Sequence, residues 1–228
     1  MRALLLPIKD HRNAKQRLAC ILSPEERQAL AHAMMQDVLN VVKRVRRAQQ
    51  IFVVTNYEPA MRIAESAGWQ VLTESHQISE SASVDAASHR CAAQGITALL
   101  RLPLDLPLIQ PEDIDELLSL DFVSPAAVLV PSRDGTGTNA ILRTPPTLFP
   151  SQFGNGSFAK HRALAEAAGA QIIVRSNARL AMDVDDPDDL LALLKEDLSS
   201  TATGQWLVGQ DMEKRLADFK LQSKSAGK

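Results

Sequence analysis

The chain alternates short apolar runs with segments of helical periodicity, and this alternation restricts the fold more than any other feature of the sequence. Buried parallel strands read as continuous apolar runs, and parallel neighbours need long crossovers that are usually helical. Such runs predict strands at residues 3–7, 50–55, 70–73, 99–109, 126–131 and 171–174, with a returning strand after the loop at 132–139. We therefore expect an α/β protein with a parallel sheet covered by helices.

Helix signals lie between these runs. Ser23 and Glu26 form a capping-box pattern with Pro24 at the first helical position, and an apolar stripe follows at helical spacing. Further helices are predicted at residues 59–67, 84–94, 111–118 and 157–168. Residues 1–197 are interpreted as one domain, and 198–228 as a Ser/Thr-rich linker followed by a helical tail. We expect this tail to dock on the body or on a second subunit, so a homodimer is one of two expected arrangements.

The charge balance and the cysteines exclude several classes of partner. A net charge of -2 disfavours nucleic acid and anionic membrane surfaces, which require concentrated Lys and Arg. Cys20 and Cys91 lie far apart and show no zinc-binding spacing. The apolar run at 3–6 is too short for a signal-peptide core, and no run approaches the roughly eighteen apolar residues of a membrane span. We expect a cytoplasmic protein that acts on small molecules.

Asp105 is the first candidate site residue. It follows the apolar residues that begin the run at 99–109 and stands between Pro103 and Pro107. Sites in α/β proteins lie at the carboxyl ends of strands, so a lone carboxylate there is a candidate ligand or catalytic group. The alternative is that Asp105 only caps a turn before the helix at 111.

A basic loop follows the first strand. It carries Lys9, Lys15 and Arg17 but no glycine, so it is neither a Walker loop nor a dinucleotide fingerprint. Any anion bound here is held mainly by these three side chains. The alternative is a solvated run of charges.

Two later segments also suit an anion. The loop before the returning strand offers backbone N–H groups and polar side chains, among them Thr138 and Asn139, although it also reads as a plain turn. A glycine-flanked serine then opens a helix, and such a start serves both as an N-cap and as a phosphate site. Its residues are Gly154, Gly156 and Ser157, with His161 one turn further on, either facing the site or packing in the core.

An acidic segment precedes the last helix of the domain. If residues 181–185 are extended, Asp183 and Asp185 share one face with Val184 opposite, which is a cation-binding arrangement. Asp186, Asp188 and Asp189 are interpreted as the N-cap and first turn of the helix at Pro187. Carboxylates at strand ends beside phosphate-binding loops are the components of a Mg²⁺-dependent nucleotidyl or phosphoryl transferase.

The sequence resembles the 2-phospho-L-lactate and phosphoenolpyruvate guanylyltransferases of deazaflavin (coenzyme F420) biosynthesis over about residues 1–194. The resemblance rests on five motifs in order: Pro7-Ile8-Lys9 with Ala14-Lys15-Gln16-Arg17-Leu18; Asp105-Leu106-Pro107-Leu108; Gly137-Thr138-Asn139-Ala140; Phe153-Gly154-Asn155-Gly156-Ser157-Phe158 with His161; and Asp183-Val184-Asp185 with Pro187 and Asp189-Leu190. It implies a glycosyltransferase-A-like nucleotidyltransferase fold with a mixed, mostly parallel sheet. Each motif is short, and it is their order that makes the match specific.

The resemblance also implies roles for the candidate residues. Asp105, Asp183 and Asp185 would hold two Mg²⁺ ions, and Lys9, Lys15 and Arg17 would bind the GTP triphosphate. The phospho-acid would be held by Thr138, Asn139, Gly154, Gly156, Ser157 and His161. We expect Lys15, Arg17 and Asp105 to act in catalysis by positioning and charge neutralisation. A phosphate monoester is largely dianionic at neutral pH, so no general base is assigned.

The chain departs from the family pattern at two places. Ala82-Ser83-Val84-Asp85 replaces a Gly-Leu-Asn element near the nucleotide, and Leu104 replaces a small residue. The Asp85 carboxylate either accepts hydrogen bonds from guanine or is an acid near a helix start. Leu104 either alters the floor of the site or packs beneath it.

Three hypotheses for function follow. The first is a guanylyltransferase that joins GMP from GTP to a three-carbon phospho-acid (2-phospho-L-lactate, phosphoenolpyruvate or 3-phosphoglycerate) with release of pyrophosphate. The others are a non-catalytic binder of nucleotide or phospho-acid, and a nucleotidyltransferase that uses another nucleoside triphosphate.

Overall fold

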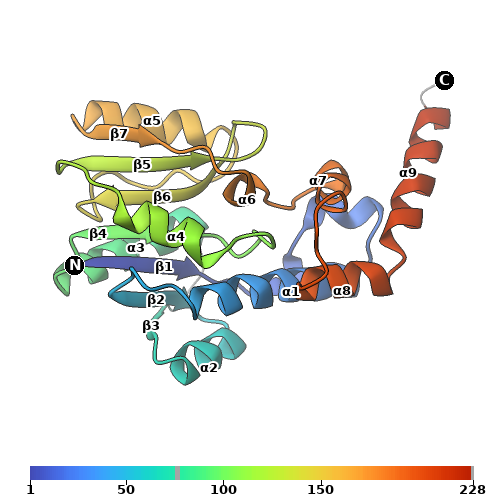
Figure 1. Cartoon of the computed structure of the whole chain (residues 1–228), viewed down its shortest axis with the longest axis horizontal. Coiled ribbons are helices and arrows are strands. Elements are labelled where there is room, and N and C mark those ends of the chain that lie inside the picture. Colours follow the sequence, from blue (N-terminus) through green and yellow to red (C-terminus); the bar gives the residue numbers. More distant parts are fainter. Residues whose placement is uncertain (75–77, 227–228) are drawn as a thin grey trace.

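The chain folds around a seven-stranded sheet with strand order β3-β2-β1-β4-β6-β5-β7 (Figure 1). The computed structural model describes residues 1–74 and 78–226. Within these residues the strands are β1 (Arg2–Pro7), β2 (Gln50–Thr55), β3 (Gln70–Thr73), β4 (Ala98–Arg101), β5 (Ala126–Pro131), β6 (Thr138–Thr144) and β7 (Gln171–Val174). Only β6 runs antiparallel to its neighbours, β4 and β5, among the described strands. The expected mixed, mostly parallel sheet is confirmed.

Helices cover both faces of the sheet because its strands are apolar on both sides. Leu4 and Leu6 of β1 belong to one core cluster, whereas Ala3 and Leu5 belong to another. The first face is covered by α1 (Pro24–Val42), α2 (Glu58–Ser66) and α4 (Pro111–Ser119). The opposite face is covered by α3 (Glu80–Ala93) and α5 (Ser157–Ala167). Among the described residues, no helix is both long and apolar enough to cross a bilayer.

The topology brings distant segments to one edge of the sheet. β1 and β4 are parallel neighbours, with Leu5 in register with Arg101, so the chain leaves both strands side by side. The segment after β1 contains the short helices η1 (His11–Asn13) and η2 (Gln16–Cys20). The segment after β4 contains Asp105. Because β6 runs in the opposite direction, its first residue, Thr138, lies at the same edge, paired with the end of β5.

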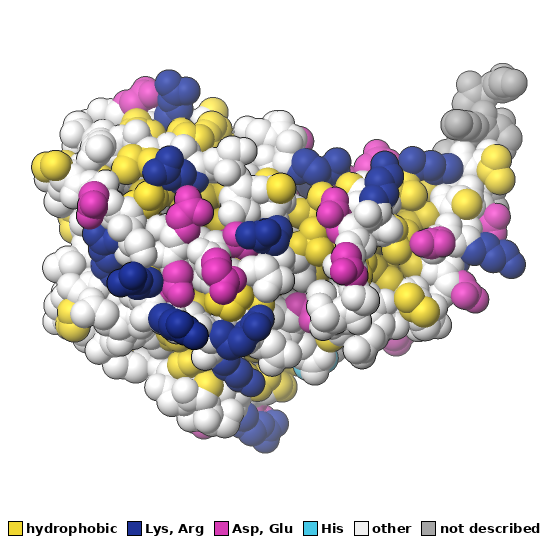
Figure 2. Space-filling model, in the orientation of Figure 1, with side chains coloured by type: hydrophobic (Ala, Val, Ile, Leu, Met, Phe, Trp, Pro, Cys, Tyr) yellow, Lys and Arg dark blue, Asp and Glu magenta, His cyan; other side chains and the backbone are white. Residues whose placement is uncertain are grey.

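A further apolar cluster lies beyond this edge, and we call it the distal core. It joins η2 and α1 to α7 (Pro187–Leu193), α8 (Ala202–Gly209) and α9 (Met212–Ala226), which Figure 1 shows to the right of the sheet. Its buried residues are Leu18, Leu22, Leu30, Met34, Met182, Val184, Leu190, Leu193, Leu207, Met212 and Leu216. Hydrophobic side chains remain visible where the three C-terminal helices meet (Figure 2). The tail therefore docks on the body of its own chain.

The Ser/Thr-rich segment at the start of 198–228 is shorter than its composition indicates, because α8 begins at Ala202. The Asp37 carboxylate of α1 accepts hydrogen bonds from the backbone N–H groups of Ala202 (2.7 Å) and Thr203 (2.9 Å) and fixes the start of α8. Gly204 packs so closely that a Cβ there would lie 2.2 Å from the carbonyl oxygen of Leu198. The Ser/Thr-rich composition of this segment gives no indication of such contacts with distant parts of the chain.

Most predicted boundaries agree with the structure to within one or two residues, with four differences. β6 begins at Thr138, inside the loop predicted at 132–139, so Thr138 and Asn139 are strand residues. The helix predicted at 84 begins at Glu80, because the Ser79 hydroxyl accepts a hydrogen bond from the Ala82 N–H. β4 ends at Arg101, so Asp105 lies in a loop. Gly156, in the left-handed region, is the N-cap of α5, and Ser157 is the first helical residue. Residues 75–77, between β3 and α3, and residues 227–228 of the tail lie outside the described residues.

Candidate active site

Two cavities meet at the carboxyl edge of the sheet. The first, of about 280 Å³, has an apolar wall that includes Ile8, Met34 and Leu104, and also contains Lys9 and Lys15. The second, of about 570 Å³, is mainly polar and is lined by Arg17, Arg133, Thr138, Asn139, Gly154, Ser157 and Asp183, among others. Asp105 and Asp185 line both cavities. If each cavity holds one ligand, the two ligands would therefore come closest to each other at these carboxylates.

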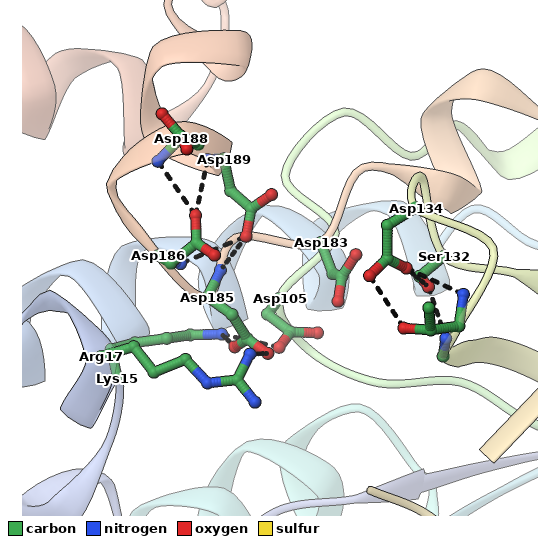
Figure 3. A network of polar contacts seen from close by, with 12 residues as sticks. Lys15, Arg17, Asp105, Ser132, Asp134, Asp183, Asp185, Asp186, Asp188 and Asp189 are labelled. Atoms are coloured by element: carbon green, nitrogen blue, oxygen red, sulfur yellow. Dashed lines mark hydrogen bonds and ion pairs between the residues drawn. The ribbon is translucent and has the colours of Figure 1, made fainter. Parts of the chain in front are cut away.

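Lys15 joins the Asp105 and Asp185 carboxylates (Figure 3). Its Nζ lies 2.7 Å from Asp105 Oδ2 and 2.9 Å from Asp185 Oδ1, and only 9% of its side chain is exposed. Burial disfavours the charged ammonium, but the two carboxylates outweigh burial and raise the pKa of Lys15 above its ordinary value. Burial likewise acts against the charged form of Asp105, but the charge of Lys15 holds the pKa of that carboxyl below its ordinary value.

Asp183 lies beside this cluster. Figure 3 shows its carboxylate facing the same space as that of Asp105. Burial and the charge of Asp105 raise the pKa of Asp183 to about 6, although Asn139 donates a hydrogen bond to it at 3.0 Å. Val184 is fully buried in the distal core, so its two acidic neighbours are turned to the cleft, as their spacing predicts.

The donor chemistry of these carboxylates suits Mg²⁺. Within residues 1–74 and 78–226, no group of three His, Cys, Asp or Glu side chains stands ready as a metal cage. Mg²⁺ commonly binds through one or two carboxylates and completes its shell with water and substrate phosphates. Carboxylates shared by two ligand cavities fit that mode of binding, in which substrate supplies part of the coordination.

The polar cavity is shaped by a tight loop. Asp134 accepts hydrogen bonds from the Ser132 hydroxyl and the Thr136 N–H, and these lower its pKa to about 2. The Ser132 hydroxyl in turn accepts from the Gly137 N–H, and a Cβ on Gly137 would lie 2.9 Å from that oxygen. The loop therefore holds Thr138 in a fixed position.

Arg101 is the site residue that sequence reasoning missed. It ends β4, is 6% exposed, and lines both cavities. Its guanidinium donates to the Asn139 carbonyl at 3.0 Å, pairs with Glu80 and lies 4.2 Å from the Phe153 ring centre. Burial lowers its pKa to about 10, so it stays charged at neutral pH. The signal in the sequence was an arginine at the end of an otherwise apolar strand.

Other predicted residues lie differently from expectation. Asp85 is engaged by the Ser151 N–H at 3.0 Å and by Arg143 at 3.4 Å, and it lines a separate small cavity. The structure therefore does not place Asp85 in the cleft, where it could accept hydrogen bonds from guanine. Gly156 shapes the start of α5 without lining either cavity, and Leu104 both lines the first cavity and packs on the core.

His161 is buried behind the cleft and supports it. Its Nε2 accepts a hydrogen bond from the Gln152 N–H at 2.8 Å, so the proton of the neutral ring lies on Nδ1. Nδ1 is 3.0 Å from the Thr138 hydroxyl and donates to it. Since the ring is fully buried, we assign His161 to positioning Thr138 rather than to touching substrate.

His161 should make the protein less stable in mild acid. Burial, with the charges of Arg143 and Arg101, lowers its pKa to about 4. In the unfolded chain the pKa of a histidine is about 6.5. Between pH 6.5 and pH 4 only the unfolded chain therefore binds the proton. The free energy of unfolding consequently falls as the pH falls through this range, by about 3 kcal/mol in total. Urea unfolding from pH 7 to pH 4.5 measures this slope. His161→Gln should flatten it, and the difference isolates His161 from His11, whose pKa burial also lowers. Equal slopes would contradict the assignment.

The fold is that of the α/β class to which solved nucleotide-diphospho-sugar transferases and cytidylyltransferases belong. A nucleotide-diphospho-sugar transferase from Desulfovibrio desulfuricans superposes with a TM-score of 0.77 at 15% identity, covering 96% of this chain and 97% of that one. Residues 1–208 match the family described as guanylyl transferase CofC-like, and the chain belongs to it.

Two relatives illustrate the family. A phosphoenolpyruvate guanylyltransferase from Conexibacter woesei is 36% identical over 190 residues, which cover 83% of this chain and 85% of the relative. A 3-phospho-D-glycerate guanylyltransferase from Phenylobacterium zucineum is 32% identical over 199 residues, covering 86% and 90%. The resemblance read from the five motifs is confirmed.

Proposed function

We propose that the chain is a Mg²⁺-dependent guanylyltransferase that transfers GMP from GTP to a three-carbon phospho-acid and releases pyrophosphate, as a step of coenzyme F420 biosynthesis. The observation that carries the proposal is the meeting of two chemically different cavities at Asp105 and Asp185. The family and its named relatives supply the substrate classes.

The cavities suit different substrates. The first combines an apolar wall with Lys9 and Lys15, which suits a nucleoside followed by phosphates. The second is rich in polar donors and lies against the N-terminus of α5, which suits a small phosphorylated acid. Arg101, at the boundary, adds a positive charge to both.

The proposed reaction is an in-line displacement at the α-phosphorus of GTP. A phosphate oxygen of the phospho-acid forms the new P–O bond, and the bond to the β-phosphate breaks as pyrophosphate leaves. Asp105, Asp183 and Asp185 would hold Mg²⁺, which neutralises charge on the transferred and leaving phosphates. Thr138 and Ser157 would orient the attacking phosphate. His161 takes no proton, because it is buried and both ring nitrogens are hydrogen bonded.

A substrate matrix tests the proposal. The protein is incubated with Mg²⁺, each of the four nucleoside triphosphates, and 2-phospho-L-lactate, phosphoenolpyruvate or 3-phosphoglycerate, and pyrophosphate is measured. We expect release with GTP and one of the acids, and far less without an acid. Release only with another triphosphate would favour the alternative nucleotide. Thermal stabilisation without turnover in any pairing, beside an active guanylyltransferase as control, would favour a binding protein.

A further inference from the structure

Lys15 holds a position that a metal ion also requires. Its ammonium bridges Asp105 and Asp185 at 2.7 and 2.9 Å, one contact to each carboxylate. Magnesium bound to the same oxygens would lie about 2.1 Å from each. An ion bound to both oxygens would compete with the ammonium for the same lone pairs, and the two like charges would repel each other at short range, so they disfavour each other at these oxygens.

The Lys15 side chain can also reach a second set of anionic partners. Its backbone has φ 51°, in the left-handed region, where it joins η1 to η2, and its carbonyl is fixed by the Leu18 N–H at 2.9 Å. The side chain can therefore pivot on a stationary backbone. It already lines the first cavity, which we assign to the nucleotide, so phosphates there lie within reach of its four-carbon stem.

We propose that Lys15 and the divalent ion exchange places, with Lys15 leaving Asp105 and Asp185 for the nucleotide phosphates when the ion arrives. This inference rests on the proposed function. Lys15 then acts twice. Without substrate it neutralises two carboxylates that would otherwise repel each other in a partly buried cleft. With substrate it neutralises the triphosphate.

The exchange has a consequence for the order of binding. An ion arriving alone must break two charge-assisted hydrogen bonds and leave Lys15 without a partner. An ion arriving with the triphosphate gives Lys15 new anionic partners. The free enzyme should therefore bind divalent ions weakly, and Lys15 should be the reason.

Removing Lys15 should consequently tighten metal binding while it lowers turnover. We expect Lys15→Gln to bind Mn²⁺ at least about tenfold more tightly than the natural chain without nucleotide, since one charge-assisted hydrogen bond is worth about that factor. Mn²⁺ affinity is measured by electron paramagnetic resonance of the free ion, and GTP turnover in parallel. Lys15→Met serves as a second neutral variant of similar length should the first fail to fold.

Arg17→Gln is the matched control. It removes the same charge near Asp185, whose Oδ2 lies 3.9 Å from the guanidinium, but the Arg17 side chain is 70% exposed and does not lie between the carboxylates. A general electrostatic effect would tighten Mn²⁺ binding similarly in both variants. The exchange predicts clear tightening only when Lys15 is lost.

The outcomes separate this inference from the function itself. Unchanged or weaker Mn²⁺ binding by the Lys15 variants, with pyrophosphate release by the natural chain intact, would overturn the exchange alone. Equal tightening in Arg17→Gln would also overturn it. Failure of all variants to bind Mn²⁺, even with GTP present, would overturn both the exchange and the metal-dependent function.

Discussion

Asp105→Asn should lower GTP-dependent pyrophosphate release about a thousandfold while the fold persists. The substitution keeps the size of the side chain but removes the charge that lies 2.7 Å from Lys15 and faces both cavities. An amide oxygen is a much weaker ligand for Mg²⁺ than a carboxylate, and charge neutralisation is the main catalytic contribution available here. Turnover is measured with the acid that gives the fastest release in the substrate matrix, over a range of Mg²⁺ concentrations.

Asp121→Asn provides the comparison for this loss. Asp121 is exposed, lies between α4 and β5 and lines neither cavity, so the same chemical change there should leave turnover unaltered. Near-normal turnover of Asp105→Asn at low Mg²⁺ would show that the metal is held elsewhere. Circular dichroism of both variants establishes that the fold is retained.

Arg101→Met should lower the free energy of unfolding by about 3 kcal/mol and also reduce turnover. The variant keeps much of the buried volume but leaves Glu80 without its cation and the Asn139 carbonyl without a donor. An unpaired carboxylate would then face both cavities, where it would repel an anionic substrate. Unfolding in urea, followed through the fluorescence of Trp69 and Trp206, measures the stability change.

Two further variants show whether the ion pair is the cause. Adding Glu80→Gln to Arg101→Met should restore part of the lost stability, because the unpaired charge is removed. Arg162→Met breaks an exposed pair with Glu166, whose side chains are 60% and 56% exposed, and should change stability by less than about 0.5 kcal/mol. Equal losses in the Arg101 and Arg162 variants would contradict a role for burial.

The strands were predictable because their apolar runs carry the information locally. The limits predicted at 50–55, 70–73, 126–131 and 171–174 match β2, β3, β5 and β7. Capping signals were equally local, and the Ser23 and Glu26 box opens α1 as expected. The missed helix α8 depends instead on Asp37, which is 165 residues before Ala202 in the chain. No pattern within the segment itself reveals such a contact.

In the candidate site, too, some residues could be identified from local sequence patterns and others could not. Asp105 was identifiable because it follows an apolar run, and Asp183 and Asp185 because their spacing places both on one face of an extended segment. The fold brings all three to one cavity. Their partners were not predictable: the bridge from Lys15 and the pair between Arg101 and Glu80 follow from tertiary packing. The partners of Asp85 were not predictable either, because Arg143 and Ser151 come from a strand and a loop far along the chain.

In the distal core, α9, which is synthesised late, packs next to the basic loop after β1, which is synthesised early. Leu18, just after the basic loop, shares this core with Leu216 of α9. A ribosome adds about 5–20 residues per second from the N-terminus, so Lys15 and Arg17 emerge long before the helix that supports their loop. The strands can pair while translation continues, but the distal core is complete only once α9 has been made. A product shortened before α9 would therefore retain a sheet whose basic loop has lost part of its support.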